Sequence, residues 1–320
     1  MVRTVISDID EKNLGLTYVH DHLIVRKAEY NSLPARILLD DVVKTLEEVR
    51  RFKKFGGQTI VDVQPFGAGR DIEALKYISE ESGVKIIAST GLHKLDFYRE
   101  NFWSLKAEVD EITEVFIDEI VNGAYAFDEK DPFKKRTNIK AGIIKIATDN
   151  NGLTDYYQKI FKAAAKAHRQ TGVSIITHTE LSTFGTDQAA FLIDNGVEPN
   201  SIIISHMDKR LNIENIIKLA KIGVFLEFDC IARYKYHGDN EEILIIKRMV
   251  EEGFVDRIVM GMDSTRERFL SYGGNCGLTY IIEKFIPKMK MLGIKEKEIK
   301  KILIYNPESA LRIRRIGSEL

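Results

Sequence analysis

The sequence of 320 residues has few of the features that mark several protein classes. It contains only two cysteines and six prolines, which excludes a disulfide-stabilised scaffold and a collagen-like chain. No run of about 18 apolar residues occurs, so we expect no membrane-spanning helix. Its 47 basic residues nearly balance 48 acidic ones, which argues against nucleic acid or a membrane surface as partner. We therefore expect a cytoplasmic globular protein.

A repeated pattern runs through the chain: a segment with helical periodicity, then a glycine, then a short apolar run rich in β-branched residues. Gly83 and Gly172 are examples, and a glycine in this position is the usual C-terminal cap of a helix. Because the runs are almost continuously apolar, they are typical of parallel strands buried on both faces. We expect eight strands, at residues 16–22, 59–63, 84–88, 140–147, 173–177, 201–205, 224–228 and 257–260.

The segments between these strands have helical periodicity, and Asp40, Asp71, Thr154 and Thr186 stand where helix N-caps belong. Strands that alternate with helices predict an α/β protein, a (β/α)8 TIM barrel. No Gly-x-Gly-x-x-Gly and no P-loop follows a strand, which disfavours a nucleotide-binding domain. We expect a single barrel domain over residues 1–320, with residues 1–13 as a lead-in. The expected helices lie at 40–55, 71–82, 104–121, 154–170, 186–195, 212–221 and 241–252.

Histidines gather at the predicted strand ends. Four of the seven histidines fall there, and an aspartate follows the last strand; these residues are His20, His22, His178, His206 and Asp263. In such barrels the chemistry collects at the carboxyl ends of the strands. His20 and His22 are two apart, so their side chains point to one face and suit a divalent metal. Each histidine alone could equally be satisfied by hydrogen bonds, but the set together predicts a metal site.

Lys145 lies within an apolar predicted strand, where a buried ammonium is costly unless it is paired or chemically altered. One interpretation is a lysine carboxylated by CO2, an anion that bridges two metals. A second is an amine of lowered pKa that forms a Schiff base. A third is a lysine whose ammonium reaches solvent at the strand end. The nearby histidines favour the first, because a Schiff-base site does not need four imidazoles.

The ordered set of strand-end residues resembles the phosphotriesterase-related branch of the amidohydrolase superfamily over nearly the whole chain. The resemblance implies that His20, His22 and Asp263 hold a buried metal and that His178 and His206 hold a more exposed one. Carboxylated Lys145 and a hydroxide would bridge the two. Zinc is the metal we expect, with Mn, Co or Fe as alternatives. The implied activity is metal-dependent hydrolysis, with Asp263 as the catalytic proton acceptor beside Lys145. Related barrels often form homodimers.

The loops after the last two predicted strands carry cations that suit a phosphate or carboxylate. Lys235 and Arg266 match the phosphate-binding lysine and arginine of family members that hydrolyse phosphorylated sugar lactones. The tyrosine that completes this set of phosphate-binding residues is replaced here by Phe269, which leaves Tyr272 as a candidate substitute. His93 stands where the lactonases of acyl-homoserine lactones carry a tyrosine. We therefore predict a lactonase for a phosphorylated aldono-1,4-lactone.

Several alternatives remain at this stage. The chain could be an acyl-homoserine lactone lactonase with promiscuous phosphotriesterase activity, although the charged loop after the last strand lacks the long hydrophobic segment of those enzymes. It could be a Schiff-base aldolase that uses Lys145, or a non-catalytic barrel that binds a sugar phosphate. The cations of the two loops could also form a solvated rim. His168 and His237 are expected at the surface.

Overall fold

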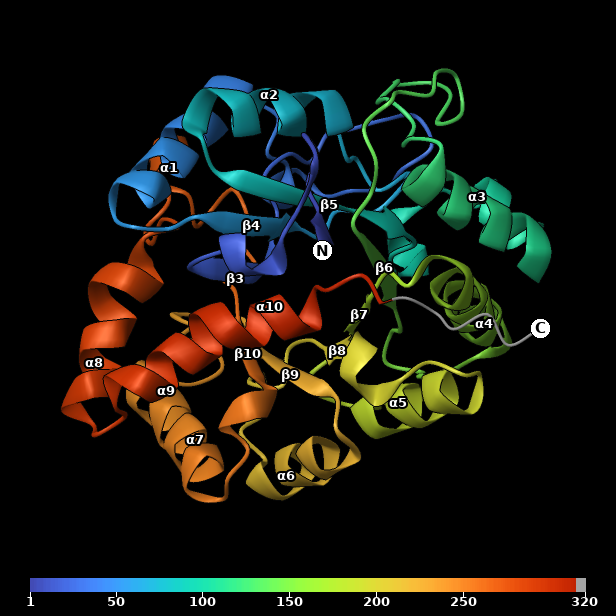
Figure 1. The fold of residues 1–320 in the computed structure, drawn as a ribbon. Coiled ribbons are helices and arrows are strands. Elements are labelled where there is room, and N and C mark those ends of the chain that lie inside the picture. The colour runs from blue at the N-terminus through green and yellow to red at the C-terminus, as the bar shows by residue number, and fades with distance from the viewer. Residues whose placement is uncertain (315–320) are drawn as a thin grey trace.

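A closed barrel of parallel strands forms the centre of the molecule. The computed structural model describes residues 1–314, and Figure 1 shows helices surrounding the strands. Each strand pairs in parallel with the next along the chain. The strands are β3 (Thr17–Asp21), β4 (Thr59–Asp62), β5 (Lys85–Gly91), β6 (Ile143–Ala147), β7 (Ile175–His178), β8 (Ile202–Ile204), β9 (Phe225–Phe228) and β10 (Ile258–Met260).

The first and last strands close the barrel through backbone hydrogen bonds just beyond β10. The N–H groups of Met262 and Asp263 donate to the carbonyl oxygen of His20, at 3.0 and 3.1 Å. The barrel helices are α1 (Val42–Lys54), α2 (Ile72–Ser82), α3 (Val109–Val121), α4 (Asp155–Thr171), α5 (Gly185–Asp194), α6 (Ile213–Ile222) and α7 (Asp239–Glu251). The chain then continues through α8 (Ile286–Met291), α9 (Glu296–Lys300) and α10 (Asn306–Ala310).

The barrel interior is a small apolar core, separate from the larger core between strands and helices. Its members come from all eight strands' inward positions and include Val19, Val61 and Phe225. Ala310 and Leu311 belong to the same cluster, because α10 crosses one end of the barrel (Figure 1). Beside it lies a two-stranded antiparallel sheet of β1 (Val2–Arg3) and β2 (Asp8–Ile9). This end is therefore filled, and the carboxyl ends of the strands are left for a site.

The structure confirms the predicted fold class and differs from the prediction at several boundaries. Helix α1 is capped by Asp41, whose Oδ1 accepts from Val43 N and Lys44 N, because Asp40 instead pairs with Arg266. Helix α5 begins at Gly185, since the left-handed Phe184 precedes it and places Thr186 inside the helix.

The segment after β10 was the least well predicted part of the chain. Residues 281–310 contain two π-helical turns, Ile281–Phe285 and Lys301–Tyr305, that run into α8 and α10. Pro287 and Pro307 each follow one of these π-helical turns and stand in the first turn of the α-helical segment that continues it. Each proline removes one N–H donor from a continuous helix. Within residues 1–314, none of the helices combines the length and the apolar character needed to cross a membrane.

Candidate metal centre

The structure brings together the histidines and the aspartate that the sequence placed at strand ends. His20 lies on β3 and His178 ends β7, while His22, His206 and Asp263 follow β3, β8 and β10 by one to three residues. All five line one cavity of about 150 Å³. Because each strand delivers its side chain to the same end of the barrel, residues up to 243 apart in sequence become neighbours.

Two groups of ligand atoms can be distinguished in this cavity. Asp263 Oδ1 lies 3.4 Å from His22 Nε2 and 3.6 Å from His20 Nε2. On the other side, His206 Nε2 lies 2.8 Å from His178 Nδ1. The atoms of His20, His22 and Asp263 are close enough together to hold one metal ion. The donor set of imidazole and carboxylate suits Zn, Mn, Co or Fe.

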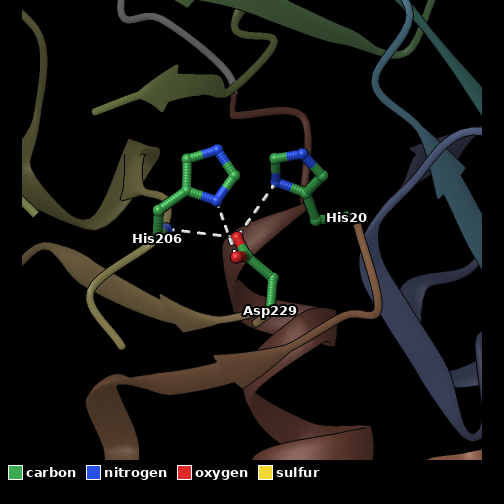
Figure 2. A group of neighbouring side chains, drawn as sticks. All are labelled: His20, His206 and Asp229. Carbon is green, nitrogen blue, oxygen red and sulfur yellow. Dashed lines mark hydrogen bonds and ion pairs between the residues drawn. The ribbon is translucent and has the colours of Figure 1, made fainter. Parts of the chain in front are cut away.

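Acidic side chains on β9 and directly after it contact the far sides of the His20 and His206 rings. Figure 2 shows the Asp229 carboxylate between His20 and His206, with Oδ1 2.6 Å from His206 Nδ1 and Oδ2 3.3 Å from His20 Nδ1. Glu227 Oε2 lies 2.8 Å from the same nitrogen of His20. These contacts turn the Nε2 atoms of both rings toward the cavity, which is the usual role of carboxylates behind metal-binding histidines.

The backbone at two of these residues is strained. His206 has a φ of 62° and Asp263 a φ of 44°, in the left-handed region that residues with a Cβ rarely adopt. Such a conformation costs on the order of 1–3 kcal/mol and persists only where surrounding contacts hold it. His206 N donates to Asp229 Oδ2 at 3.1 Å. Ser264 N, next to Asp263, donates to Asp21 Oδ1 at 3.0 Å.

Lys145 is fully buried on β6, and its Nζ has no hydrogen-bond partner among the described residues. The interpretation of an ammonium that reaches solvent is therefore wrong. Gly91 on the neighbouring β5 makes room for this strand, because a Cβ there would lie 1.8 Å from the Lys145 carbonyl oxygen. Burial lowers the pKa of the Lys145 amine to about 8, against the opposing charges of Glu227 and Asp229. A buried amine without a partner fits a group that is modified or binds a ligand.

Three histidines of the cavity, His20, His178 and His206, favour the neutral state that metal binding requires. Burial, and then the nearby Lys145, holds the pKa of His20 well below its usual range. Burial has the same effect on the pKa values of His178 and His206. Burial opposes the ionisation of Asp263, but the charge of Arg233 and the hydrogen bond from His22 outweigh it and keep its pKa well below the ordinary value. The arrangement thus presents neutral imidazoles beside an ionised carboxylate.

The predicted substrate-binding residues divide into two groups. His93 is buried in the cavity wall, stacked on Phe97 with ring centroids 3.9 Å apart. Lys235 is exposed, with its ammonium over the ring of Tyr236, and Arg266 pairs with Asp40. Neither cation lines the cavity.

Tyr272 lies away from the cavity, and its side chain contacts the start of α1. Its hydroxyl donates to Asp41 O at 2.7 Å, accepts from Asp41 N at 3.0 Å and lies 2.9 Å from Thr45 Oγ1. Phe269, at the position where the resemblance expects a tyrosine, is fully buried. The Tyr272 hydroxyl is thus committed to holding α1 against the loop after β10.

Sequence reasoning missed Glu227, Asp229 and the role of Arg233. The signal was present, since one acid within the apolar run of β9 and another directly after it are as unusual as a lysine in β6. The prediction that His168 and His237 lie at the surface was wrong. The side chain of His237 is only 5 % exposed. His168 is buried, and its Nδ1 makes a hydrogen bond of 2.8 Å with the backbone carbonyl oxygen of Val173.

Comparison with known proteins identifies the family. The sequence model of the Phosphotriesterase family matches residues 1–311. The chain belongs to the phosphotriesterase family. This family is dependent on binuclear metal centres, and the histidine and aspartate groups of this member could bind metal.

Similar proteins cover the phosphotriesterase-family chain almost completely. The phospho-furanose lactonase of Mycoplasmopsis synoviae is 33% identical over an alignment of 327 residues, which covers 97% of this chain and 91% of the relative. An amidohydrolase structure from Mycoplasma synoviae has a TM-score of 0.93 at 32% identity and covers 98% of this chain and 92% of its own. A lactonase structure from Listeria monocytogenes has a TM-score of 0.88 at 30% identity. The match covers 98% of this chain and 99% of the Listeria chain.

Proposed function

We propose that this chain is a metal-dependent lactone hydrolase that acts on phosphorylated sugar lactones, of the aldono-1,4-lactone class. The observation that carries the proposal is the convergence of the four predicted histidines and Asp263 on a single small cavity. The buried Lys145 lies close enough to contribute to the lowered pKa of His20. Family membership supports hydrolysis, and similar proteins named as a lactonase and as a phospho-furanose lactonase support the lactone. The cytoplasmic location and the homodimer stay predictions.

We assign the metal ligands as the sequence predicted. His20, His22 and Asp263 would hold one divalent ion, and His178 with His206 would hold the second. Lys145, carboxylated by CO2, would lie between them. The unpartnered Nζ of Lys145 supports this assignment, because carboxylation converts a costly buried cation into an anion that metals neutralise. We expect zinc, and the ligands also suit Mn, Co or Fe.

Two divalent ions bound here would polarise the lactone carbonyl and supply hydroxide near neutral pH. The chain's own residues do the rest. Asp263 is ionised and lies at the cavity wall, so it can accept the proton of the attacking water and pass it to the ring oxygen that leaves. Asp229 and Glu227 keep the imidazoles oriented. The stacked rings of His93 and Phe97 form one wall of the cavity and would shield one side of the lactone ring from water.

The small cavity supports a division of the substrate between the interior and the rim. A volume of about 150 Å³ offers room for a lactone ring but not for a long acyl chain. A phosphate on such a ring would extend outward, where Lys235 and Arg266 stand on the loops after β9 and β10. Arginine and lysine bind phosphate with charge-assisted hydrogen bonds. Arg266 would have to exchange its present partner Asp40 for that phosphate.

The test is proton release by the zinc-loaded protein on matched lactones with and without a terminal phosphate. We expect turnover of the phosphorylated members, at a kcat/KM well above that of the neutral ones. Turnover of neutral lactones alone would keep the hydrolase and remove the phosphate from the proposal. No proton release on either set, with two metals bound per chain, would overturn lactone hydrolysis.

A further inference from the structure

Arg233 reaches the cavity from the loop after β9. The preceding Ala232 has a left-handed φ of 58°, and Arg233 N donates to Cys230 O at 2.9 Å, so the chain turns sharply back over the barrel. The buried Arg268 fixes this turn, because its Nη2 donates to Ile231 O at 2.7 Å. The Arg233 side chain is only 15% exposed and lines the cavity. These two hydrogen bonds to backbone carbonyl oxygens fix the loop and therefore the position of Arg233.

The guanidinium of Arg233 holds one side of the Asp263 carboxylate. Nη2 donates to Asp263 Oδ2 at 2.9 Å and also to the backbone carbonyl of Asp263. The other carboxylate oxygen, Oδ1, faces His20 and His22. Arg233 thus fixes both the rotamer and the strained backbone of Asp263, with one oxygen toward the imidazoles and one toward the guanidinium.

Most donors of this guanidinium have no acceptor. A guanidinium carries five N–H donors, yet both side-chain hydrogen bonds of Arg233 come from Nη2. Its Nε is buried without a partner among the described residues. Buried donors such as this Nε are rarely left unpaired. Nη1 makes no hydrogen bond to a described residue either, and Arg233 lines the cavity that also holds Asp263. Free guanidinium donors at a cavity wall fit a ligand oxygen, above all a carboxylate.

We propose that Arg233 is both a positioning residue for Asp263 and a substrate-binding residue, which donates to the ester oxygens of the lactone and to the carboxylate that replaces them. The inference rests on the proposed function. In the reaction, the bond between the carbonyl carbon and the ring oxygen breaks, and the carbon gains an oxygen from water. Asp263 transfers one water proton to the ring oxygen, and the second is released when the new carboxylic acid ionises. Arg233 faces the carboxylate that results, whereas Lys235 and Arg266 face the distant phosphate.

The test compares Arg233→Met, Arg233→Lys and the rim control Arg266→Met in the zinc-loaded protein. We expect Arg233→Met to lower kcat about 10²-fold on phosphorylated and neutral lactones alike, a loss typical of a removed transition-state donor. Metal content should stay at the native level. Arg233→Lys should recover part of kcat, and added guanidinium at millimolar concentration should partly rescue Arg233→Met. Arg266→Met should raise KM for phosphorylated lactones alone.

A binding measurement separates this proposal from the function on which it rests. Calorimetry with gluconate, an unphosphorylated hydroxy acid, requires no turnover, and we expect about tenfold weaker binding by Arg233→Met, because a charge-assisted hydrogen bond is lost. Equal gluconate affinity in the native protein and the variant would overturn substrate binding by Arg233. A loss of metal that parallels the loss of activity would reduce Arg233 to a structural support. If the native protein hydrolyses no lactone, the proposed function fails, and the gluconate result still decides Arg233.

Discussion

The interior of the candidate site and its rim are built on different principles. Inside, carboxylates hold His20 and His206 from behind, as Asp229 holds His206, and Lys145 is fully enclosed. At the rim, Lys235 stacks on a neighbouring tyrosine and Arg266 pairs with Asp40, both at exposed positions. Fixed interior groups are suited to chemistry that needs a defined geometry. Exposed, exchangeable cations are suited to choosing a substrate, and the predictions below test this division.

Lys145→Ala should have the largest effect. Removing the amine removes the group that we place between the two metals, so metal content should fall and lactone hydrolysis should disappear. Short carboxylic acids such as acetate should restore part of both, because they replace the missing anion. Metal analysis with and without acetate is the measurement, and circular dichroism serves as the folding control. Full metal retention in the variant would refute the bridging role.

Asp263→Asn should lower kcat by roughly 10²–10⁴-fold, the range for a lost general acid–base group. The amide keeps the shape of the side chain but cannot accept the proton, so the fold should remain. Steady-state kinetics on a phosphorylated lactone measure the effect. An unchanged kcat would remove Asp263 from proton transfer.

Asp229→Asn should act through the metal. The change weakens the support behind His206 and His20, which are 2.6 and 3.3 Å away, and such changes cost about 10–100-fold in metal affinity. Competition with a zinc chelator measures the affinity. At saturating zinc the kcat should recover most of its native value, and a defect that zinc does not reduce would contradict this role.

The pH dependence of activation should follow the amine of Lys145. Only a neutral amine reacts with CO2, and the pKa of Lys145 is lowered to about 8 by burial. At a constant concentration of dissolved CO2, the rate of activation of metal-free protein by zinc should therefore rise about tenfold per pH unit below 8 and level off above it. Activation that is independent of pH between 6 and 9 would argue against carboxylation.

Changes at the rim should be the smallest and the most selective. Lys235→Ala and Arg266→Ala should each raise KM about tenfold for phosphorylated lactones, the value of one charge-assisted hydrogen bond, with little effect on neutral lactones. Lys297→Ala on α9 is the matched control for loss of an exposed charge. Equal KM effects of these two changes on both substrate classes would favour a solvated rim.

Tyr272→Phe should leave KM unchanged and lower the free energy of unfolding by about 1 kcal/mol, because the hydroxyl of Tyr272 holds α1.

The fold and the ligand candidates could be predicted because both leave local patterns. Glycine caps such as Gly83 and Gly172 mark helix ends, and polar residues that end apolar runs mark the site. The orientation of Arg233 and the commitment of Tyr272 to α1 could not be predicted, because both depend on contacts between loops distant in sequence. The start of α5 was missed for another reason: Leu181, Ser182 and Phe184 adopt left-handed conformations that their residue types do not announce.

The closure of the barrel has a consequence for folding stability. Its seam joins β3 to the segment after β10 through the His20 carbonyl and the Asp21 carboxylate, which lies 243 residues from its partner Ser264. The proposed ligands lie on both sides of this seam, with His20 and His22 at β3 and Asp263 after β10. A metal ion held by them would therefore also connect the two ends of the sheet. Binding to the folded state alone stabilises a protein by about 2.7 kcal/mol at 100 times the Kd. Metal supply would then control the stability of the folded barrel as well as its activity.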